Sequence, residues 1–162
     1  MAINERTRAD WDTYFLGLAA AAASRSSCTQ DKHGAVMVSK RRIRSTGYNG
    51  TPTGYGHCDE GACPRGKKGD PTKPCWGLHA EANALLYTGP EEREGATLYV
   101  TCPPCIECAK LIANSGLREV VAQEGPSEDL EKVRRFLLDC KVRFRILGGD
   151  GTGQLKVRPK QR

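Results

Sequence analysis

The sequence predicts a three-layer α/β/α domain, and three observations lead to this fold class. The chain has 162 residues, which suits one domain with a hydrophobic core of its own. One helical pattern and a pair of strand patterns come first. After residue 79, helices and strands alternate, and this order favours parallel strands joined by right-handed crossover helices. We therefore expect one domain over residues 1–148 and a separate tail over residues 149–162.

The elements before residue 50 are a helix and a strand pair. The helix, expected over residues 10–26, has apolar side chains at helical spacing: Trp11, Phe15, Leu18 and Ala22. Residues 35–38 and 43–48 read as short strands joined by the polar turn SKRR. Basic residues surround this turn: Lys40, Arg41, Arg42 and Arg44. Such a run is usually a solvated turn, although it could also attract phosphate.

The elements after residue 79 complete the alternation. Helices are expected over 79–87, over 105–115 with Gly116 as the stop, and over 127–140 with Ser127 as N-cap. Strands are expected over 97–101, 119–123 and 142–147, where β-branched and aromatic residues collect. No internal repeat interrupts this order. The helices and strands together account for most of the chain outside residues 49–78.

Residues 49–78 fit no element. They contain seven glycines, four prolines and three cysteines without helical or strand periodicity. A structureless stretch of this length is unusual inside a compact domain. We expect either a functional loop or a loop that something holds in place.

The net charge of +6 says little about partners. Four of the basic residues lie in the last seven positions, and residues 1–155 carry 21 basic and 19 acidic side chains, a net charge of +2. The tail follows the glycine-rich stretch GGDGTGQ, which is typical of a flexible linker. A nucleic-acid-binding arm is one interpretation of the tail, and a disordered solubilising end is the favoured one.

Composition points to the cytoplasm. The longest apolar run, residues 16–23, is far shorter than a membrane span, and acidic residues interrupt the basic-then-apolar order of a signal peptide. In a reducing compartment, the eight cysteines are expected to bind metal or to react rather than to form disulfides.

The strongest chemical signal is His79-Ala80-Glu81 followed by Pro104-Cys105-Ile106-Glu107-Cys108. This is the H-x-E … P-C-x-x-C signature of zinc-dependent nucleobase deaminases. Cys105 and Cys108 are three residues apart on one helical turn, so that both sulfur atoms project to one side. Two thiolates and one imidazole hold zinc and leave a fourth position for a water of lowered pKa.

Glu81 is then the expected proton shuttle, not a metal ligand. It would take a proton from water, protonate the ring nitrogen and deliver a proton to departing ammonia. A C-x-x-C pair alone is common in structural zinc sites and redox motifs, and a lone His-x-Glu usually means nothing. Their combination in this order predicts a catalytic zinc site.

Three motifs carry a resemblance to a known family. HAEANALL, TLYVTCPPCIECAKLI and STGYNGTPTG resemble the deoxycytidylate deaminase family of the cytidine-deaminase-like superfamily, over about residues 25–147. The resemblance implies a five-stranded mixed sheet between helices and hydrolysis of dCMP to dUMP and ammonia, supplying dUMP for dTMP synthesis. It also implies zinc ligands His79, Cys105 and Cys108 and the catalytic acid/base Glu81. Many relatives form hexamers that respond to dCTP and dTTP.

The same resemblance indicates substrate contacts. Asn49 of GYNG matches a sugar-contacting residue, and Ala80 lies inside the zinc motif. Arg25 and Ser26 fall where the family places phosphate contacts, although an ordinary helix end explains them equally well. His33 stands where the family commonly has valine, either as a solvent-facing change or as one that alters the accepted base.

Four further cysteines predict a second metal site. Cys28, Cys58, Cys63 and Cys75 lie outside the catalytic motif, with His57 as a substitute ligand. They resemble the additional zinc site of some phage and bacterial relatives, which would tie residues 49–78 to the domain. The alternative is four separate reduced thiols. Cys102 and Cys140 have no expected role.

Three classes of function therefore compete. The first is a dCMP deaminase. The second is a deaminase of cytosine, guanine, modified dCMP, or a base in tRNA or single-stranded DNA, and only the basic tail favours nucleic acid. The third is a non-catalytic zinc-binding module, which has no use for Glu81.

Overall fold

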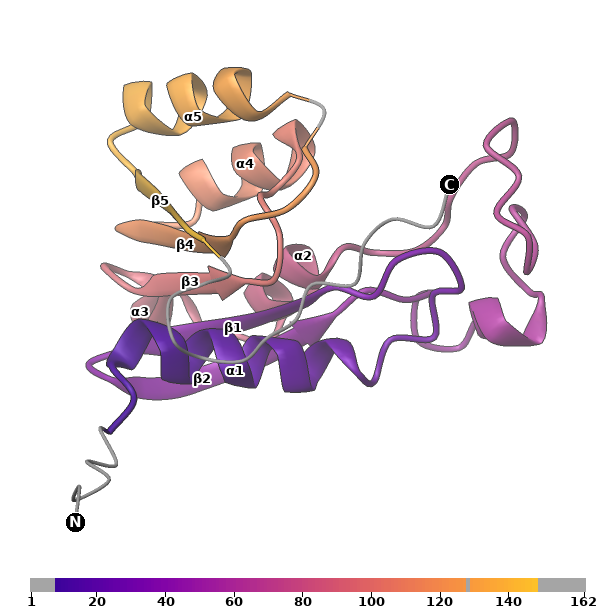
Figure 1. Cartoon of the computed structure of the whole chain (residues 1–162), viewed down its shortest axis with the longest axis horizontal. Coiled ribbons are helices and arrows are strands. Elements are labelled where there is room, and N and C mark those ends of the chain that lie inside the picture. Colours follow the sequence, from indigo (N-terminus) through magenta and orange to yellow (C-terminus); the bar gives the residue numbers. More distant parts are fainter. Residues whose placement is uncertain (1–7, 128, 149–162) are drawn as a thin grey trace, which may run out of the picture.

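The computed structural model describes residues 8–127 and 129–148 (Figure 1). In chain order the elements are α1 (Trp11–Ala23), β1 (Gly34–Ser39), β2 (Arg42–Tyr48), the 3-10 helix η1 (Cys58–Glu60), α2 (Ala80–Leu86), α3 (Pro90–Arg93), β3 (Thr97–Val100), α4 (Ile106–Ala113), β4 (Glu119–Gln123), α5 (Leu130–Asp139) and β5 (Arg143–Leu147). The expected tail, residues 149–162, lies outside the described residues.

The five strands form one mixed sheet in the order β2-β1-β3-β4-β5. β1 is antiparallel to both β2 and β3, whereas β3, β4 and β5 are parallel. The parallel strands are joined through α4 and α5, as the alternating sequence pattern predicts. The predicted five-stranded mixed sheet is therefore confirmed.

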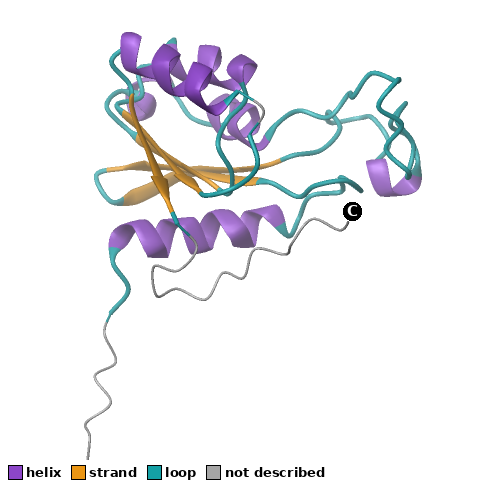
Figure 2. Cartoon of the chain, turned by 45° about the horizontal axis from the view of Figure 1, so that its top comes forward, coloured by secondary structure: helices purple, strands orange, loops and turns teal. Residues whose placement is uncertain are grey.

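Helices cover both faces of this sheet (Figure 2). On one face α1 packs Phe15, Leu16 and Ala19 against Val36 and Tyr99. On the other face, α2, α4 and α5 bury the larger core. Its members include Met37, Ala84, Leu98, Ile112, Val120 and Leu137. The predicted three-layer arrangement is present, with a single helix in one of the outer layers.

Two glycines in the hairpin let helices approach the sheet. A Cβ atom at Gly34 of β1 would collide with the backbone of Ala19 in α1, and one at Gly47 of β2 would collide with the backbone of Ala80 in α2. Only glycine fits where a helix backbone lies this close to a strand. The second contact fixes the start of α2 next to the end of β2.

Element ends differ from the sequence prediction by three residues in two places and by at most two residues elsewhere. Helix α1 ends at Ala23 instead of Ser26, because Ser24 caps the helix and Ser26 turns away to bond another segment. Ser127 was predicted as the N-cap of α5, and this is wrong: the N-cap is Asp129, whose carbonyl accepts the N–H of Val133. The short helices η1 and α3 were not predicted. Both are less than two turns long and show no apolar periodicity.

Within residues 8–127 and 129–148, none of the helices has the length and apolarity needed to cross a bilayer.

Candidate zinc centre

His79 and Cys105 occupy the N-cap positions of two neighbouring helices. His79 precedes α2 and Cys105 precedes α4, while Cys108 lies in the first turn of α4. Reciprocal backbone hydrogen bonds between Gly50 and Leu78, of 3.1 and 2.8 Å, close the base of the long loop. His79 follows Leu78 directly. The closure of the loop therefore places His79 near the end of β3.

The His-Cys-Cys cluster (His79, Cys105 and Cys108) has the geometry of a zinc site. His79 Nδ1 lies 3.4 Å from each sulfur atom, and all three potential ligand atoms lie within 4.8 Å of one another. Tetrahedral zinc with ordinary bond lengths places its nitrogen and sulfur ligands about 3.6 Å apart. The residues present therefore fit zinc. His79 and Cys105 are exposed and Cys108 is buried, so the cluster opens to solvent on one side.

Hydrogen bonds within the cluster shift the pKa values of all three of its members. The thiol of Cys108 and the ring of His79 hydrogen-bond Cys105 and lower its pKa to about 3. The same contact with Cys105, together with burial, raises the pKa of Cys108. The bond to Cys105 also raises the pKa of His79. Zinc binds the thiolate form of cysteine together with neutral imidazole, and a lowered pKa of Cys105 favours that form.

Glu81 lies in the first turn of α2 and is 5% exposed. Burial raises the pKa of its carboxyl group, although the adjacent His79 counteracts the rise. Its side chain also contacts the thiol of Cys108. A carboxyl group with a raised pKa beside a metal site can both accept and return a proton near neutral pH.

Sequence reasoning missed Cys102, which joins His33 at the site. Cys102 Sγ lies 3.2 Å from His33 Nδ1. Burial and the charge of nearby Glu81 raise the pKa of Cys102 to about 12, and burial lowers the pKa of His33. The thiol of Cys102 and Nδ1 of His33 share a hydrogen bond whose direction is set by the histidine tautomer. The position of Cys102 just after β3, three residues before Cys105, is the signal that would have identified it.

The side chain of Asn49 is engaged by the backbone before β1. Its Oδ1 accepts the N–H of His33 at 2.8 Å, and its Nδ2 donates to the carbonyl of Asp31 at 2.8 Å. Asn49 thereby holds the segment that presents His33. One hydrogen of the amide group is left for a ligand, which is compatible with the predicted sugar contact.

The predicted phosphate contacts differ in accessibility. Ser26 is 3% exposed, and its hydroxyl donates to the carbonyl of Asn49 and accepts the N–H of Cys28. Arg25 is exposed. Ala80 is buried at the start of α2, so only its backbone remains for a substrate. Arg25 is therefore the exposed cation of the predicted pair. Ser26 instead joins the segment after α1 to the segment after β2.

The loop cysteines (Cys28, Cys58, Cys63 and Cys75) come together at the far end of the irregular segment. The thiols of Cys58 and Cys75 contact the sulfur of Cys63, as do the backbone N–H groups of Trp76 and Arg65, which lower its pKa. Burial raises the pKa of Cys58 to about 11, and the neighbouring sulfurs of Cys63, Cys28 and Cys75 add to the rise.

The loop cysteines are spread more widely than the His-Cys-Cys cluster. Among the described residues, only the latter has at least three ligand atoms that all lie within 4.8 Å of one another. His57 caps η1 next to Cys58 and is exposed. The irregular segment, residues 49–78, extends away from the sheet (Figure 1).

Comparison with known proteins gives a consistent family. The model of the "Cytidine and deoxycytidylate deaminase zinc-binding region" matches residues 9–124. A deoxycytidylate deaminase of Mycobacterium phage D29 is 51% identical over 124 residues, which are 71% of this chain and 95% of the phage protein. The deoxycytidylate deaminase of Saccharomyces cerevisiae is 42% identical over 130 residues, covering 78% of this chain and 42% of the yeast protein.

A solved structure shares the fold. The dCMP deaminase of cyanophage S-TIM5, crystallised in complex with dCMP and dUMP, superimposes with a TM-score of 0.69 at 26% sequence identity. The match covers 88% of this chain and the whole of the cyanophage chain.

Proposed function

This chain belongs to the cytidine and deoxycytidylate deaminase family, and from that premise we propose that it hydrolyses dCMP to dUMP and ammonia. The observation that carries the proposal is the buried carboxyl group of Glu81 in contact with the His-Cys-Cys cluster. A site that only stabilises the fold has no need of a buried acid beside its metal. The relatives described above support dCMP as the substrate, because each is a deoxycytidylate deaminase.

The chain's own residues would divide the work as follows. His79, Cys105 and Cys108 hold zinc, which supplies the Lewis acidity that activates water at neutral pH. Glu81 would carry two protons in turn, the first from the attacking water to the cytosine ring nitrogen and the second from the added hydroxyl group to the leaving amine. The backbone of Ala80 lines the base site, and the exposed Arg25 meets the phosphate. Ser26 would hold the segment next to Arg25 through its hydrogen bonds to Asn49 and Cys28.

We also propose a role for His33 in substrate choice. Cys102 binds Nδ1, and Asn49 fixes the backbone at the same residue. The hydrogen bond at Nδ1 leaves Nε2 as the ring nitrogen that can meet a ligand. A fixed polar ring at a position where the family resemblance implies valine favours substrates that present a hydrogen-bonding group to it.

Ammonia release from a panel of compounds tests the substrate. The panel is dCMP, CMP, dCTP, deoxycytidine, cytosine, guanine, 5-methyl-dCMP and RNA. We expect kcat/KM for dCMP to exceed that for deoxycytidine at least 100-fold, because each charge-assisted phosphate contact contributes roughly tenfold or more. A higher kcat/KM for a free base or for RNA would contradict the proposal. In the His33→Val variant we expect the ratio between dCMP and 5-methyl-dCMP to change while zinc content stays constant.

A second zinc at the loop cysteines is part of the proposal. Its support is the contact of Cys63 with Cys58 and Cys75 and the pair of backbone N–H groups directed at the Cys63 sulfur, a pattern suited to a metal-bound thiolate. His57 remains the substitute ligand. Metal analysis of the purified full chain should give about two zinc ions per chain. A value of one would contradict the second site.

We further propose a cytoplasmic location, a homo-oligomer such as the hexamer of related enzymes, and regulation by dCTP and dTTP. The free state of all eight cysteines supports the first. Light scattering measures the second, and dCMP saturation curves with and without each triphosphate measure the third. A monomeric mass contradicts the oligomer, and unchanged saturation curves contradict the regulation. We do not expect nucleic acid to be a partner of the zinc centre.

A further inference from the structure

Cys102 and His33 face each other beyond the end of the β1–β3 strand pair. In the antiparallel register of these strands, Ala35 lies opposite Val100, so that the same register continued by two residues brings His33 opposite Cys102. Ala35 and Val100 both belong to the core that α2 and α4 cover. Side chains two residues apart along a strand point to the same face. His33 and Cys102 therefore lie on the face where α2 and α4 begin.

The backbone that carries the His33 ring is held from both sides. The N–H of His33 donates to Asn49 Oδ1 at 2.8 Å, and its carbonyl accepts the N–H of Asn49 at 3.2 Å. The N–H of Gly34 donates to Thr101 Oγ1 at 3.0 Å, and its carbonyl accepts the N–H of Thr101 at 3.0 Å. These bonds fix the backbone, so that the two side-chain torsions are the main freedom left to His33.

The contact with Cys102 selects one orientation of the imidazole ring. Rotation of a histidine ring by half a turn about its Cβ–Cγ bond exchanges Nδ1 with Cδ2 and Nε2 with Cε1, and the two orientations have similar torsional energies. Cys102 Sγ lies 3.2 Å from His33 Nδ1, and only the orientation that brings a nitrogen to the sulfur forms this hydrogen bond. The same orientation leaves Nε2, and not a C–H group, as the part of the ring that can meet a ligand.

The pair lacks the charge state of a reactive cysteine and its base. A thiol beside an imidazole occurs in enzymes as a nucleophile activated by a base, and a reactive cysteine needs a lowered pKa because the thiolate is the attacking form. Here burial and the charge of Glu81 raise the pKa of Cys102 to about 12, and burial lowers the pKa of His33. Cys102 therefore stays a thiol at neutral pH, which suits holding the ring and not attacking a substrate.

We infer that Cys102 is a positioning residue that acts through His33. It holds the imidazole so that Nε2 faces the substrate, and it thereby sets which cytidine nucleotides the site accepts. The charge of His79 acts on His33 and that of Glu81 acts on Cys102, so that the pair lies near the His-Cys-Cys cluster. The inference rests on the proposed deamination and on the role of His33 in substrate choice.

Kinetics of Cys102 variants test the inference in the zinc-loaded full-length chain. In Cys102→Ala we expect kcat/KM for dCMP to fall about 10-fold, as for the loss of one hydrogen bond. The ratio of kcat/KM for dCMP to that for 5-methyl-dCMP should change in the same direction as in His33→Val. Cys102→Ser keeps a hydrogen-bonding group and should restore both quantities to within about threefold of the parent values. In the His33→Val background, Cys102→Ala should change neither, because the ring through which it acts is absent.

Nuclear magnetic resonance gives a readout that does not depend on turnover. The chain has three histidines, and the spectrum of His33→Val assigns the ring nitrogens of His33. Cys102→Ala should move the chemical shifts of these nitrogens, because Nδ1 loses its hydrogen bond. The shifts of His57 and His79 should stay as in the parent protein.

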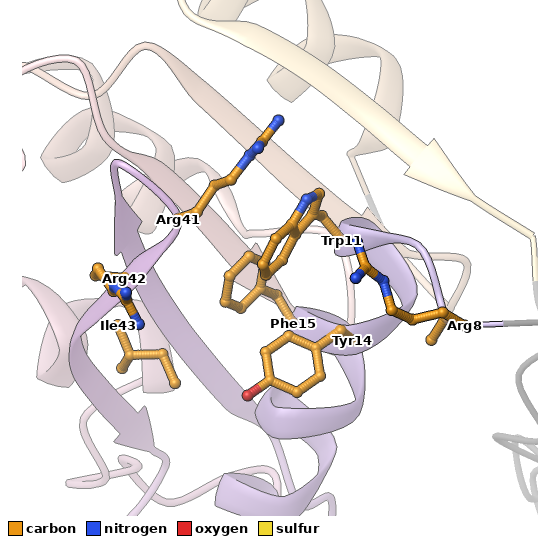
Figure 3. A pocket seen from close by; sticks show the side chains of 8 residues that line it. Arg8, Trp11, Tyr14, Phe15, Arg41, Arg42 and Ile43 are labelled. Atoms are coloured by element: carbon orange, nitrogen blue, oxygen red, sulfur yellow. The ribbon is translucent and has the colours of Figure 1, made fainter.

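Two control variants separate positioning from a general loss of stability. Phe15→Leu shortens a buried side chain on the other face of the sheet, in the pocket between the start of α1 and the β1–β2 turn (Figure 3). It should lower the melting temperature and leave the substrate ratio unchanged. Cys140→Ala, at the exposed end of α5, should leave both unchanged.

Three results would overturn the inference. The first is a substrate ratio that stays at the parent value in Cys102→Ala, whether or not kcat/KM falls. The second is an additive effect of Cys102→Ala in the His33→Val background. The third is a set of His33 nitrogen shifts that Cys102→Ala leaves unchanged. Absence of ammonia from every compound of the panel would instead contradict the proposed function, and the nitrogen shifts would still decide whether Cys102 holds the ring.

Discussion

The His-Cys-Cys cluster and the loop cysteines use the same atom type on different supports. Every member of the first stands at the start of a helix that packs on the sheet, and the nitrogen-to-sulfur distances already match zinc. The loop cysteines stand on turns and on the single 3-10 turn η1. Cys58 and Cys63 are each only 5% exposed, yet neither belongs to a hydrophobic cluster of the core.

This difference indicates which part of the molecule depends on bound metal for its ordered structure. Packed helices hold the first set of ligands whether or not zinc is bound, which suits a site whose geometry must serve a reaction. The loop has no apolar core of its own, so that metal binding would supply the free energy that orders it. We therefore expect activity to depend on the first set and stability to depend on the second.

The largest expected effect is on activity alone. Glu81→Gln removes the proposed proton shuttle beside the His-Cys-Cys cluster while keeping the size of the side chain. We expect kcat for dCMP to fall by about 10³-fold or more, with zinc content and melting temperature near those of the parent protein. Ammonia release and metal analysis measure both.

Glu107→Gln is the matched control for this substitution. Glu107 lies on the exposed side of α4 and pairs only with Lys110, so that its loss should leave kcat within about twofold, since exposed ion pairs contribute little. Full activity in Glu81→Gln would contradict the proposed mechanism.

Exchange of one cysteine in each set gives the sharpest contrast. Cys105→Ser should abolish activity and leave about one zinc per chain, with a melting temperature close to that of the parent. Cys63→Ser should also leave about one zinc, but its melting temperature should fall by roughly 10 °C while kcat changes little. Calorimetry, metal analysis and ammonia release separate the two outcomes.

Cys140→Ser is the control for both cysteine variants. Cys140 is exposed at the end of α5 and should change none of the three measurements. Identical losses of stability in Cys105→Ser and Cys63→Ser would break the distinction between the two sets, and so would an unchanged zinc content in Cys63→Ser.

Asn49 lies between the His-Cys-Cys cluster and the loop that carries the loop cysteines. Its substitution should affect both activity and stability. Asn49→Ala removes the hydrogen bonds to His33 and Asp31 at the start of the loop. We expect the free energy of unfolding to fall by about 2 kcal/mol and kcat/KM for dCMP to fall as His33 loses its support. Urea denaturation and steady-state kinetics test this, with Asn114→Ala at the exposed end of α4 as the control. A change in only the free energy of unfolding, or only kcat/KM, would contradict the prediction that Asn49 serves both regions.

The smallest expected effect concerns the contact between α1 and the sheet, where charged side chains instead of cysteines join the elements. Asp12 of α1 accepts hydrogen bonds from Tyr99 and Arg145. Burial opposes ionisation, but these bonds prevail and lower its pKa below 3.8. A lowered folded-state pKa stabilises the protein above pH 3.8, and the contribution is lost as the pH falls through the folded-state value.

Asp12→Asn tests this charge contact. At pH 7 it should lower the free energy of unfolding by about 1 kcal/mol, because the Asp12–Arg145 pair is partly exposed. The difference from the parent protein should shrink below pH 3.8, as measured by denaturation at several pH values. A chelator should leave the difference unchanged. A difference that grows towards low pH would contradict the proposed linkage.

The sequence was most informative where chemistry requires fixed spacing or periodicity. The motif around His79 and the C-x-x-C pair predicted residues that the fold brings within 4.8 Å of one another. The alternation after residue 79 predicted the parallel half of the sheet. The N-cap of α5 was missed, because Ser127 and Asp129 are equally good caps by residue type and only the backbone path after β4 distinguishes them.

The sequence by itself determined the fold class, the zinc motif and the position of the proposed proton shuttle, because each depends on residues close together in the chain. Only the tertiary structure decided the rest, since its partners are distant in sequence. It joined the Asn49 side chain to His33 before β1, joined the Ser26 hydroxyl to the carbonyl of Asn49, and placed Cys102 against His33. It also closed a basic turn and the start of α1 into one pocket. Contacts of this kind depend on how helices cross the sheet, and no local pattern of residues encodes that crossing.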